Sequence, residues 1–143
     1  MATLKVEIVS PESALWVGEA SALIARSTDG EFTILPQHTA TVGDIVPGVV
    51  RVETSEGEVA FAVHGGYFQV GPEGSNGVTL ATVLAGVAER TTEIDVARAQ
   101  AAKEAAEAQM AEATRVESHD TASHLLAHAA LQRAELRLRA AAK

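Results

Sequence analysis

Hydrophobic and polar residues alternate with a two-residue period in the first half of the chain. The two clearest runs are those of Leu4, Val6 and Ile8, and of Val59, Phe61 and Val63. A period of two places alternate side chains on opposite faces of a strand, so each run predicts a strand with one buried face. Residues 78–85 (VTLATVLA) form the last expected strand.

Turn-forming dipeptides separate these runs at short intervals. They are Ser10-Pro11, Asp29-Gly30, Pro47-Gly48, Glu56-Gly57, Gly65-Gly66 and Asn76-Gly77. Such closely spaced turns are typical of an all-β sandwich or barrel. A parallel α/β sheet is disfavoured because no helical pattern separates the strands. The first half therefore predicts an antiparallel β-sandwich.

After Arg90 the period changes to three and four residues. Thr91 or Thr92 is expected to cap a helix from about Glu93 to Val116, with Asp95 in a capping-box position. The expected apolar stripe is Ile94, Ala97, Ala101, Ala105 and Ala108. Residues 117–120 break the pattern. A second helix from about Thr121 has the stripe Ala127, Leu131, Ala134 and Leu138, and so short a loop predicts an antiparallel hairpin.

Composition places a boundary at the same point. Residues 1–90 contain every aromatic residue, proline and glycine, whereas residues 91–143 contain none of them and are about one-third alanine. The expected fold is mainly β plus α. It consists of a β-sandwich domain over residues 1–90 and a helical hairpin over residues 91–143.

Length, charge and cysteine content exclude several classes of protein. The chain has 143 residues, enough for one compact domain and a small appendage. Its net charge of −8 argues against nucleic acid or anionic lipid as a partner. The absence of cysteine excludes disulfides and thiolate sites and fits a reducing cytoplasm. Since no run approaches the roughly 18 apolar residues of a membrane span, no direct membrane insertion is expected.

The two expected helices differ in charge. Residues 91–120 carry three basic and seven acidic side chains, whereas residues 121–143 carry four basic and one acidic. This polarity suits either attraction between the helices or docking of the second helix on an acidic surface. Arg133 and Arg137 are four residues apart, so they share a helical face and are the strongest candidates for such a contact.

Four segments in the same order resemble the epsilon subunit of the bacterial rotary, proton-translocating ATP synthase. The first is residues 30–40 (GEFTILPQHTA) followed by Pro47 to Arg51, and the second is residues 64–70 (HGGYFQV). The third runs from Thr82 through Ala88-Glu89-Arg90 to Asp95, and the fourth is the alanine-rich pair of helices with its basic end. Together the segments cover nearly the whole chain.

Two features depart from the family pattern. Gln37 stands where glycine is usual before the histidine, and residues 71–77 (GPEGSNG) form a longer turn than is usual. We expect Gln37 to alter the loop and the long turn to alter contacts at one rim of the sandwich.

The resemblance implies a non-catalytic rotor subunit. By this resemblance the β-domain attaches to the gamma subunit and the ring of c subunits, on the cytoplasmic face of the bacterial membrane. The hairpin would fold against the β-domain or extend toward the alpha and beta catalytic subunits and inhibit ATP hydrolysis. Glu31 and His38 would flank a loop that faces the c-ring; the alternative is a polar hairpin tip.

A short motif in the third segment suggests a regulatory nucleotide. Ile94, Asp95, Arg98 and Ala99 match the Ile-Asp-x-x-Arg-Ala signature with which some bacterial epsilon subunits bind ATP, and Glu89 lies where a further contributor would be. Arg98 offers a fork of donors to phosphate. The alternative is that Asp95 caps the helix and Arg98 is solvated. No cofactor is required by this interpretation, and ATP is a candidate regulatory ligand.

Two competing functions remain at this point. The first is a free-standing ATP-sensing module built on the motif at residues 94–99. The second is a small β-fold hydrolase, which is disfavoured because no nucleophile, histidine and carboxylate set stands out. His124 and His128 have a spacing that permits metal binding, but without further ligands an exposed pair is the better interpretation.

Overall fold

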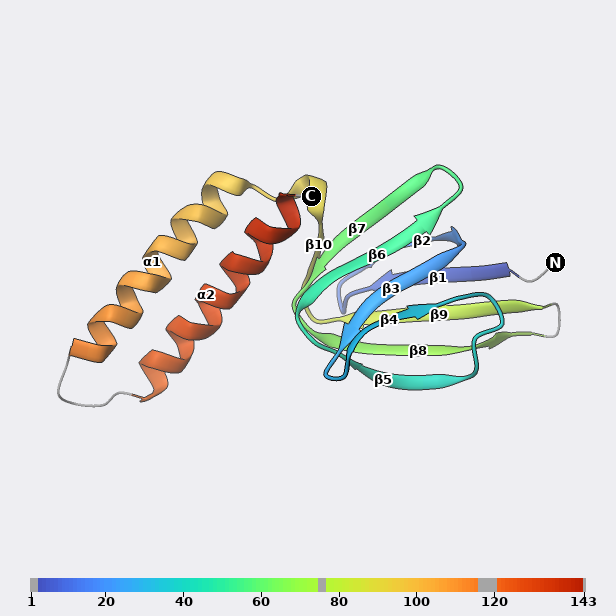
Figure 1. Cartoon of the computed structure of the whole chain (residues 1–143), viewed down its shortest axis with the longest axis horizontal. Coiled ribbons are helices and arrows are strands. Elements are labelled where there is room, and N and C mark those ends of the chain that lie inside the picture. The colour runs from blue at the N-terminus through green and yellow to red at the C-terminus, as the bar shows by residue number, and fades with distance from the viewer. Residues whose placement is uncertain (1–2, 75–76, 116–120, 143) are drawn as a thin grey trace. The chain divides into compact units, whose positions relative to one another are not determined.

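The computed structural model describes residues 3–74, 77–115 and 121–142. The chain divides into two compact units, Met1–Arg90 and Thr91–Lys143. The first unit consists of strands and the second of helices (Figure 1).

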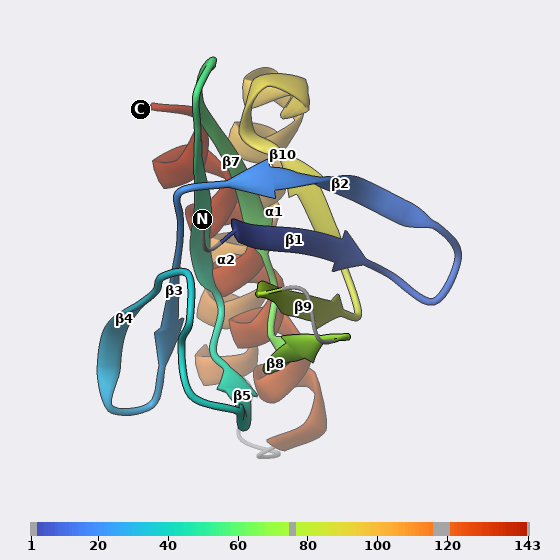
Figure 2. The same cartoon turned by 90° about the vertical axis from the view of Figure 1, so that its right-hand side faces the viewer.

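The described part of the first unit is a sandwich of two five-stranded sheets (Figures 1 and 2). In one sheet the strand order is β2 (Ala14–Ala20), β1 (Thr3–Val9), β9 (Val78–Ala85), β8 (Gly66–Glu73) and β5 (Thr41–Ile45). In the other it is β10 (Ala88–Arg90), β7 (Gly57–Val63), β6 (Gly48–Thr54), β3 (Ala22–Ser27) and β4 (Gly30–Ile34). The predicted sandwich is confirmed.

One strand pair departs from the antiparallel pattern. β1 runs parallel to β9, with Val6 opposite Ala81, and antiparallel to β2, with Val6 opposite Gly18. A tight hairpin forces its two strands to be antiparallel, whereas strands joined through a long connection can pair in either direction. β1 and β9 are far apart in sequence, so their direction is set by packing.

The core contains the alternate side chains that face between the sheets. Leu4, Val6 and Ile8 of β1 are fully buried, and Phe61 of β7 is buried against them in the same cluster. Val63 is also buried and Val59 packs at the margin, so both predicted runs have their apolar face inward. Trp16 and Phe32 lie at the edge of the core and are only partly buried. The Trp16 ring lies against Gly18 of its own strand, in the space that a Cβ there would occupy.

The chain passes repeatedly from one sheet to the other, and backbone hydrogen bonds secure these crossings. Between β7 and β8 the His64 N–H donates to the Val87 carbonyl at 3.0 Å. Gly65, with φ of 104°, continues this crossing, and any side chain at Gly66 would collide with the Leu84 carbonyl of β9. The Gly-Gly pair is therefore required by the close approach of β8 to β9.

The long turn expected at residues 71–77 is partly strand. β8 continues to Glu73, which pairs with Val78, so residues 71–73 extend the ladder instead of forming a loop. Residues 75 and 76 lie outside the described part.

The first helix begins later than expected. Thr91–Glu93 form a 3₁₀ turn, and α1 runs from Val96 to Arg115. The cap is Asp95, whose Oδ1 accepts the Arg98 N–H at 3.0 Å. The predicted cap at Thr91 or Thr92 is wrong, because the carboxylate three residues before Arg98 meets the unpaired amide of the first turn.

The buried face of α1 also differs from the predicted stripe. Ala97, Ala101, Ala105 and Ala108 are exposed, whereas Ala99 and Ala106 are buried and Lys103 and Met110 are half-buried. Alanine occurs all around this helix, so its periodicity does not distinguish one face from the next. Ile94 precedes the helix and is half-buried.

α2 runs from Thr121 to Ala141 and packs along α1. Its predicted face is confirmed, since Ala127 and Ala134 are buried and Leu131 and Leu138 half-buried. The helix end at Val116 and the break at residues 117–120 lie outside the described residues. Neither described helix has the length and apolarity needed to cross a membrane.

A chain truncated after Arg90 should remain folded, because every member of the main core cluster comes from the first unit. We expect urea to unfold it in one cooperative transition, as monitored by circular dichroism. In the same truncated chain Phe61→Ala should lower the free energy of unfolding by about 3–5 kcal/mol. A disordered truncated chain would show that the sandwich requires the helices.

Candidate functional site

The nucleotide motif lies at the N-terminus of α1, where Asp95 already has a structural role. One carboxylate oxygen of Asp95 accepts the Arg98 N–H, and the Asp95 carbonyl accepts the Ala99 N–H at 2.9 Å. Arg98 is exposed, whereas Ala99 is 3% exposed and presents almost no surface to a ligand. The capping alternative is therefore realised for Asp95, and Arg98 is the motif residue with an accessible side chain.

Glu89 is placed in the first unit, on β10. Its Oε1 lies 3.7 Å from Nε2 of His64, a side chain that is only 6% exposed. Glu89 pairs with Ala62 across the sheet, so its position is fixed by strand pairing. The four other motif residues belong to the second unit.

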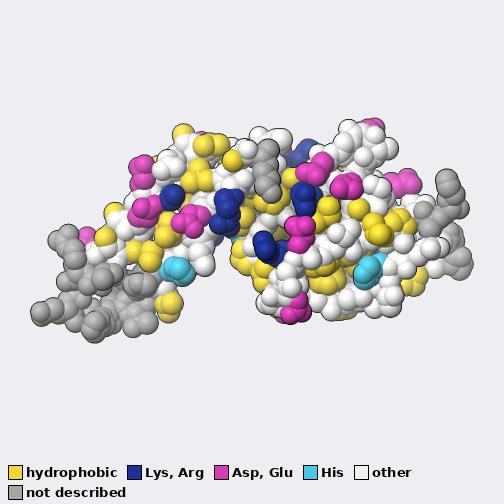
Figure 3. Space-filling view, viewed as in Figure 1, with side chains coloured by type: hydrophobic (Ala, Val, Ile, Leu, Met, Phe, Trp, Pro, Cys, Tyr) yellow, Lys and Arg dark blue, Asp and Glu magenta, His cyan; other side chains and the backbone are white. Residues whose placement is uncertain are grey.

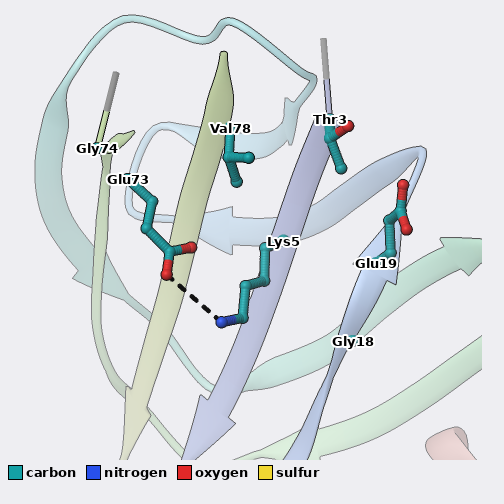
Figure 4. A pocket seen from close by; sticks show the side chains of 7 residues that line it. All are labelled: Thr3, Lys5, Gly18, Glu19, Glu73, Gly74 and Val78. Carbon is teal, nitrogen blue, oxygen red and sulfur yellow. Dashed lines mark hydrogen bonds and ion pairs between the residues drawn. The ribbon is translucent and has the colours of Figure 1, made fainter. Parts of the chain in front are cut away.

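A cavity of about 520 Å³ opens on the sheet that contains β1 (Figure 4). Its lining residues are Thr3, Lys5, Gly18, Glu19, Glu73, Gly74 and Val78. Lys5 points toward Glu73, with Nζ and Oε1 3.5 Å apart. The cavity has two carboxylates, Glu19 and Glu73, and its one ammonium, that of Lys5, is already paired with Glu73. It is therefore unsuited to a nucleotide phosphate. None of the predicted motif residues lines it.

β4 is the edge strand of its sheet (Figure 2); Glu31 is its second residue, and His38 follows its last residue by four positions. Of the residues between them, 32–34 belong to β4 and 35–37 to the loop that follows it, so only His38 lies in a loop. Glu31 Oε1 is 3.3 Å from an Nη atom of Arg51 on β6, and the Glu31 side chain is 59% exposed. In Figure 3 the basic side chains in view on the β-domain likewise lie beside acidic ones.

His38 belongs to the loop formed by residues 35–40, which we name the His38 loop. The His38 N–H donates to the Leu35 carbonyl at 3.1 Å, which closes a four-residue turn with Pro36 and Gln37 at its centre. Gln37 has a φ of 70°. Proline in the second position and a positive φ in the third are the features of a type II turn.

The left-handed conformation of Gln37 explains why glycine is suited to this position. For a residue with a Cβ, this conformation is about 1–2 kcal/mol less favourable than the right-handed one. Gln37 nevertheless adopts the backbone geometry that glycine adopts easily. Its N–H donates to Oγ1 of Thr79 on β9 at 2.8 Å.

The two candidate arginines on α2 differ in accessibility. Arg133 is exposed and Arg137 is half-buried. His128 is exposed, and the side chain of His124 lies outside the described part. Among the described residues, no group of three or more histidine, aspartate or glutamate side chains is arranged to hold a metal ion.

Comparison with known families covers both units. Residues 3–91 match the family model for the β-sandwich domain of the ATP synthase delta/epsilon chain, and residues 92–142 match that of its long α-helix domain. The chain belongs to the ATP synthase epsilon-chain family. The two matches meet within a residue of the boundary between the two units.

Curated relatives support this assignment. The ATP synthase epsilon chain of Laribacter hongkongensis is 44% identical over 110 residues, covering 76% of this chain and 74% of that one. The epsilon chain of Alkalihalophilus pseudofirmus is 37% identical over 109 residues, covering 76% and 77%. The epsilon chain of Thermobifida fusca is 44% identical over 110 residues, covering 73% and 74%.

Solved structures show the same fold. A chain in the mitochondrial ATP synthase of Euglena gracilis aligns with all of this chain and 83% of its own length, with a TM-score of 0.78 and 24% identity. A chain from the central stalk and c-ring of the Tetrahymena thermophila mitochondrial enzyme gives a TM-score of 0.56 at 14% identity, with 96% of each chain covered.

Sequence reasoning missed three partners of the candidate residues in this epsilon-family chain. They are Arg51 beside Glu31, His64 beside Glu89, and Thr79 beside Gln37. Pairs so distant in sequence have no local signal. The turn itself could have been found, because proline followed by a glycine-preferring position marks a type II turn.

Proposed function

We propose that the chain is a non-catalytic central-stalk subunit of a bacterial ATP synthase that links the gamma subunit to the c-ring. The observation that carries this proposal is the match of both units, in order, to the two domains of one family. The alternative of a free-standing ATP sensor receives no support from relatives that are ATP synthase epsilon chains. Attachment through partners would place the chain peripherally on the cytoplasmic face of the membrane.

The edge of the β-domain at β4 and the His38 loop is the proposed contact with the c-ring. Around His38, Leu35 is 53% exposed and Val42 is 73% exposed. Apolar side chains exposed beside a charged strand edge are typical of a recognition surface. Arg51 restrains the exposed Glu31 carboxylate, which lowers the entropy cost of ordering this side chain in a complex.

The helical unit is the proposed regulator. Most of the buried side chains in its described helices are small, namely Ala99, Ala106, Ala127, Ala134 and Ala140, and Leu136 is the one large side chain among them. A methyl group buries little area at about 25 cal/mol per Å², so separating the helices costs little per residue. A second arrangement, in which α2 extends toward the alpha and beta subunits and inhibits hydrolysis, is therefore within reach.

ATP is proposed as a regulatory ligand on one observation, the exposed Arg98 at the start of α1. A helix N-terminus carries partial positive charge, and a guanidinium there adds donors suited to phosphate. Because Asp95 caps the helix, its substitution must be designed to keep the cap. Glu89 and Ile94 remain predicted contributors, whereas the buried Ala99 offers a ligand almost no surface.

Replacing Glu31 and His38 together by alanine should weaken attachment to the enzyme. ATP synthase stripped of this chain would be titrated with wild-type and variant chains, and the bound fraction measured by sedimentation. Loss of two polar interface contacts, each worth about 0.5–1.5 kcal/mol, predicts about a five- to 150-fold lower affinity. Glu58→Ala on β7 is the matched control, because this exposed carboxylate lies away from β4. Unchanged binding of the double variant would contradict the proposed c-ring surface.

Deleting residues 121–143 should raise ATP hydrolysis by the reassembled enzyme without changing its subunit composition or proton coupling. The double substitution of Arg133 and Arg137 by alanine should do so in part. Two ion pairs of about 0.2–1 kcal/mol each correspond to about a two- to thirtyfold change in the inhibited population. The measurement pairs hydrolysis rate with ATP-driven proton pumping in vesicles. Unchanged hydrolysis would rule out inhibition, and lost pumping would show that the roles of the two units are wrongly assigned.

Isothermal titration with Mg-ATP should detect binding that Arg98→Ala abolishes. Asn caps a helix about as well as Asp, so Asp95→Asn tests the carboxylate with the cap kept, whereas Asp95→Ala should also cost about 1 kcal/mol of helix stability. Arg26→Ala, an exposed arginine of β3, controls for the loss of one charge. If Arg98→Ala binds ATP as the wild type does, any site lies elsewhere.

A further inference from the structure

Thr79 is a buried polar residue that the attachment surface described above does not include. It is 5% exposed and lies on β9, on the inward row that continues through Ala81, Val83 and Ala85. Its neighbours across the sheet are Leu4 on β1 and Pro72 on β8, both without a polar side chain. A hydroxyl in such surroundings is costly unless it forms a hydrogen bond.

The partner of Thr79 is the central peptide of the turn in the His38 loop. Oγ1 of Thr79 accepts the Gln37 N–H at 2.8 Å, across 42 positions of sequence. The peptide between Pro36 and Gln37 is the one that differs between type I and type II turns, because its plane rotates by about 150° or more between them. In a type I turn this N–H would point away from Thr79.

The hydrogen bond therefore selects one of two turn conformations. Glutamine by itself favours type I, because type II places it in the left-handed region that L-residues avoid. The observed φ of 70° thus requires compensation, and the bond to Thr79 is the contact that acts on the flipped peptide itself. The direction of the chain at Gln37 and His38 follows from that choice.

We propose that Thr79 is a positioning residue, which holds the His38 loop in its type II turn and so presents His38 to the partner of this surface. Thr79 lies in the interior and does not touch the partner. This inference rests on the proposed attachment through the His38 loop. The turn-selecting hydrogen bond can be tested separately from it.

Thr79→Val in the full chain removes the hydroxyl and keeps the side-chain shape. We expect the Gln37 amide proton to exchange about five- to tenfold faster. The strong nuclear Overhauser cross-peak between Hα of Pro36 and the Gln37 amide proton, which marks a type II turn, should weaken. Thr79→Ser keeps a hydroxyl and should restore both signals. Thr82→Val on the outward row of β9 is the matched control and should change neither.

The effect on attachment should depend on the residue at position 37. In the Gln37 background Thr79→Val should lower affinity for the stripped ATP synthase about fivefold. In the Gln37→Gly background it should lower affinity less than twofold, because glycine adopts the type II turn without help. A purely structural role of Thr79 would reduce affinity equally in both backgrounds, and this outcome would overturn the proposal.

The outcomes separate the two proposals. If Thr79→Val leaves the cross-peak and the exchange rate unchanged, Thr79 does not select the turn. If the turn changes while attachment does not, and the Glu31 and His38 double variant still weakens attachment, the positioning role is wrong and the proposed surface stands. If the double variant also binds normally, the proposed surface is wrong.

Should Thr79→Val fail to fold, the exchange rate of the Gln37 amide proton in the wild-type chain decides. Exchange as fast as in an open loop would overturn the proposal.

Discussion

The burial of alternate side chains between two sheets is the constraint on which the rest of the structure depends. Each sheet needs an apolar cover on its inner face, and the other sheet provides it. Because sequence neighbours such as β4 and β5 belong to different sheets, the chain must cross the ends of the sandwich. The crossings bring backbone groups out of the ladders, and cross-sheet bonds such as that from the Val46 N–H to the Arg26 carbonyl satisfy them. The His38 loop is one of these crossings, so its place at the end of the domain follows from the core.

The two units are stabilised by different amounts of burial. The β-domain buries large side chains such as Phe61, Leu4 and Ile8, each worth about 1.5–3 kcal/mol, in one cluster. The buried side chains of the described helices are alanine except for Leu136, and Met110, Leu131 and Leu138 are half-buried. The well-packed β-domain suits the proposed rigid attachment to the rotor. The helical hairpin, whose helices separate at low cost, suits the proposed regulatory role.

The strands and the general fold could be predicted from sequence because alternation is a local signal. The runs at Leu4 to Ile8 and at Phe61 to Val63 have one face buried, as their pattern requires. The face of α1 could not be predicted, since alanine occurs on every side and the choice depends on how α2 packs. The cap was misplaced by a few residues because threonine and aspartate are both good caps, and only the backbone geometry decides between them.

Less of the candidate site was predictable, and the reason is again physical. Glu31, His38 and Arg98 could be chosen from short motifs, and the structure leaves Glu31 and Arg98 exposed and His38 half-buried. The residues that restrain them come from other strands, as Arg51 and Thr79 do, and no local pattern contains that information. A partly buried Arg137 and an exposed Arg133 likewise differ because of packing, although their spacing makes them equivalent on an isolated helix.

The turn at Gln37 illustrates how the core can determine the conformation of a loop against the preference of the loop's own residues. An exposed turn with glutamine in its third position would adopt the type I form in isolation. The core offers a fixed acceptor at Thr79, and a buried acceptor left without a donor would cost about 1–3 kcal/mol, comparable to the strain at Gln37. In the type II turn the strain at Gln37 is offset, because the Thr79 hydroxyl then has its donor. The residue at position 37 can therefore vary away from glycine as long as the hydroxyl remains on β9, and the two positions form one unit despite the 42 residues between them.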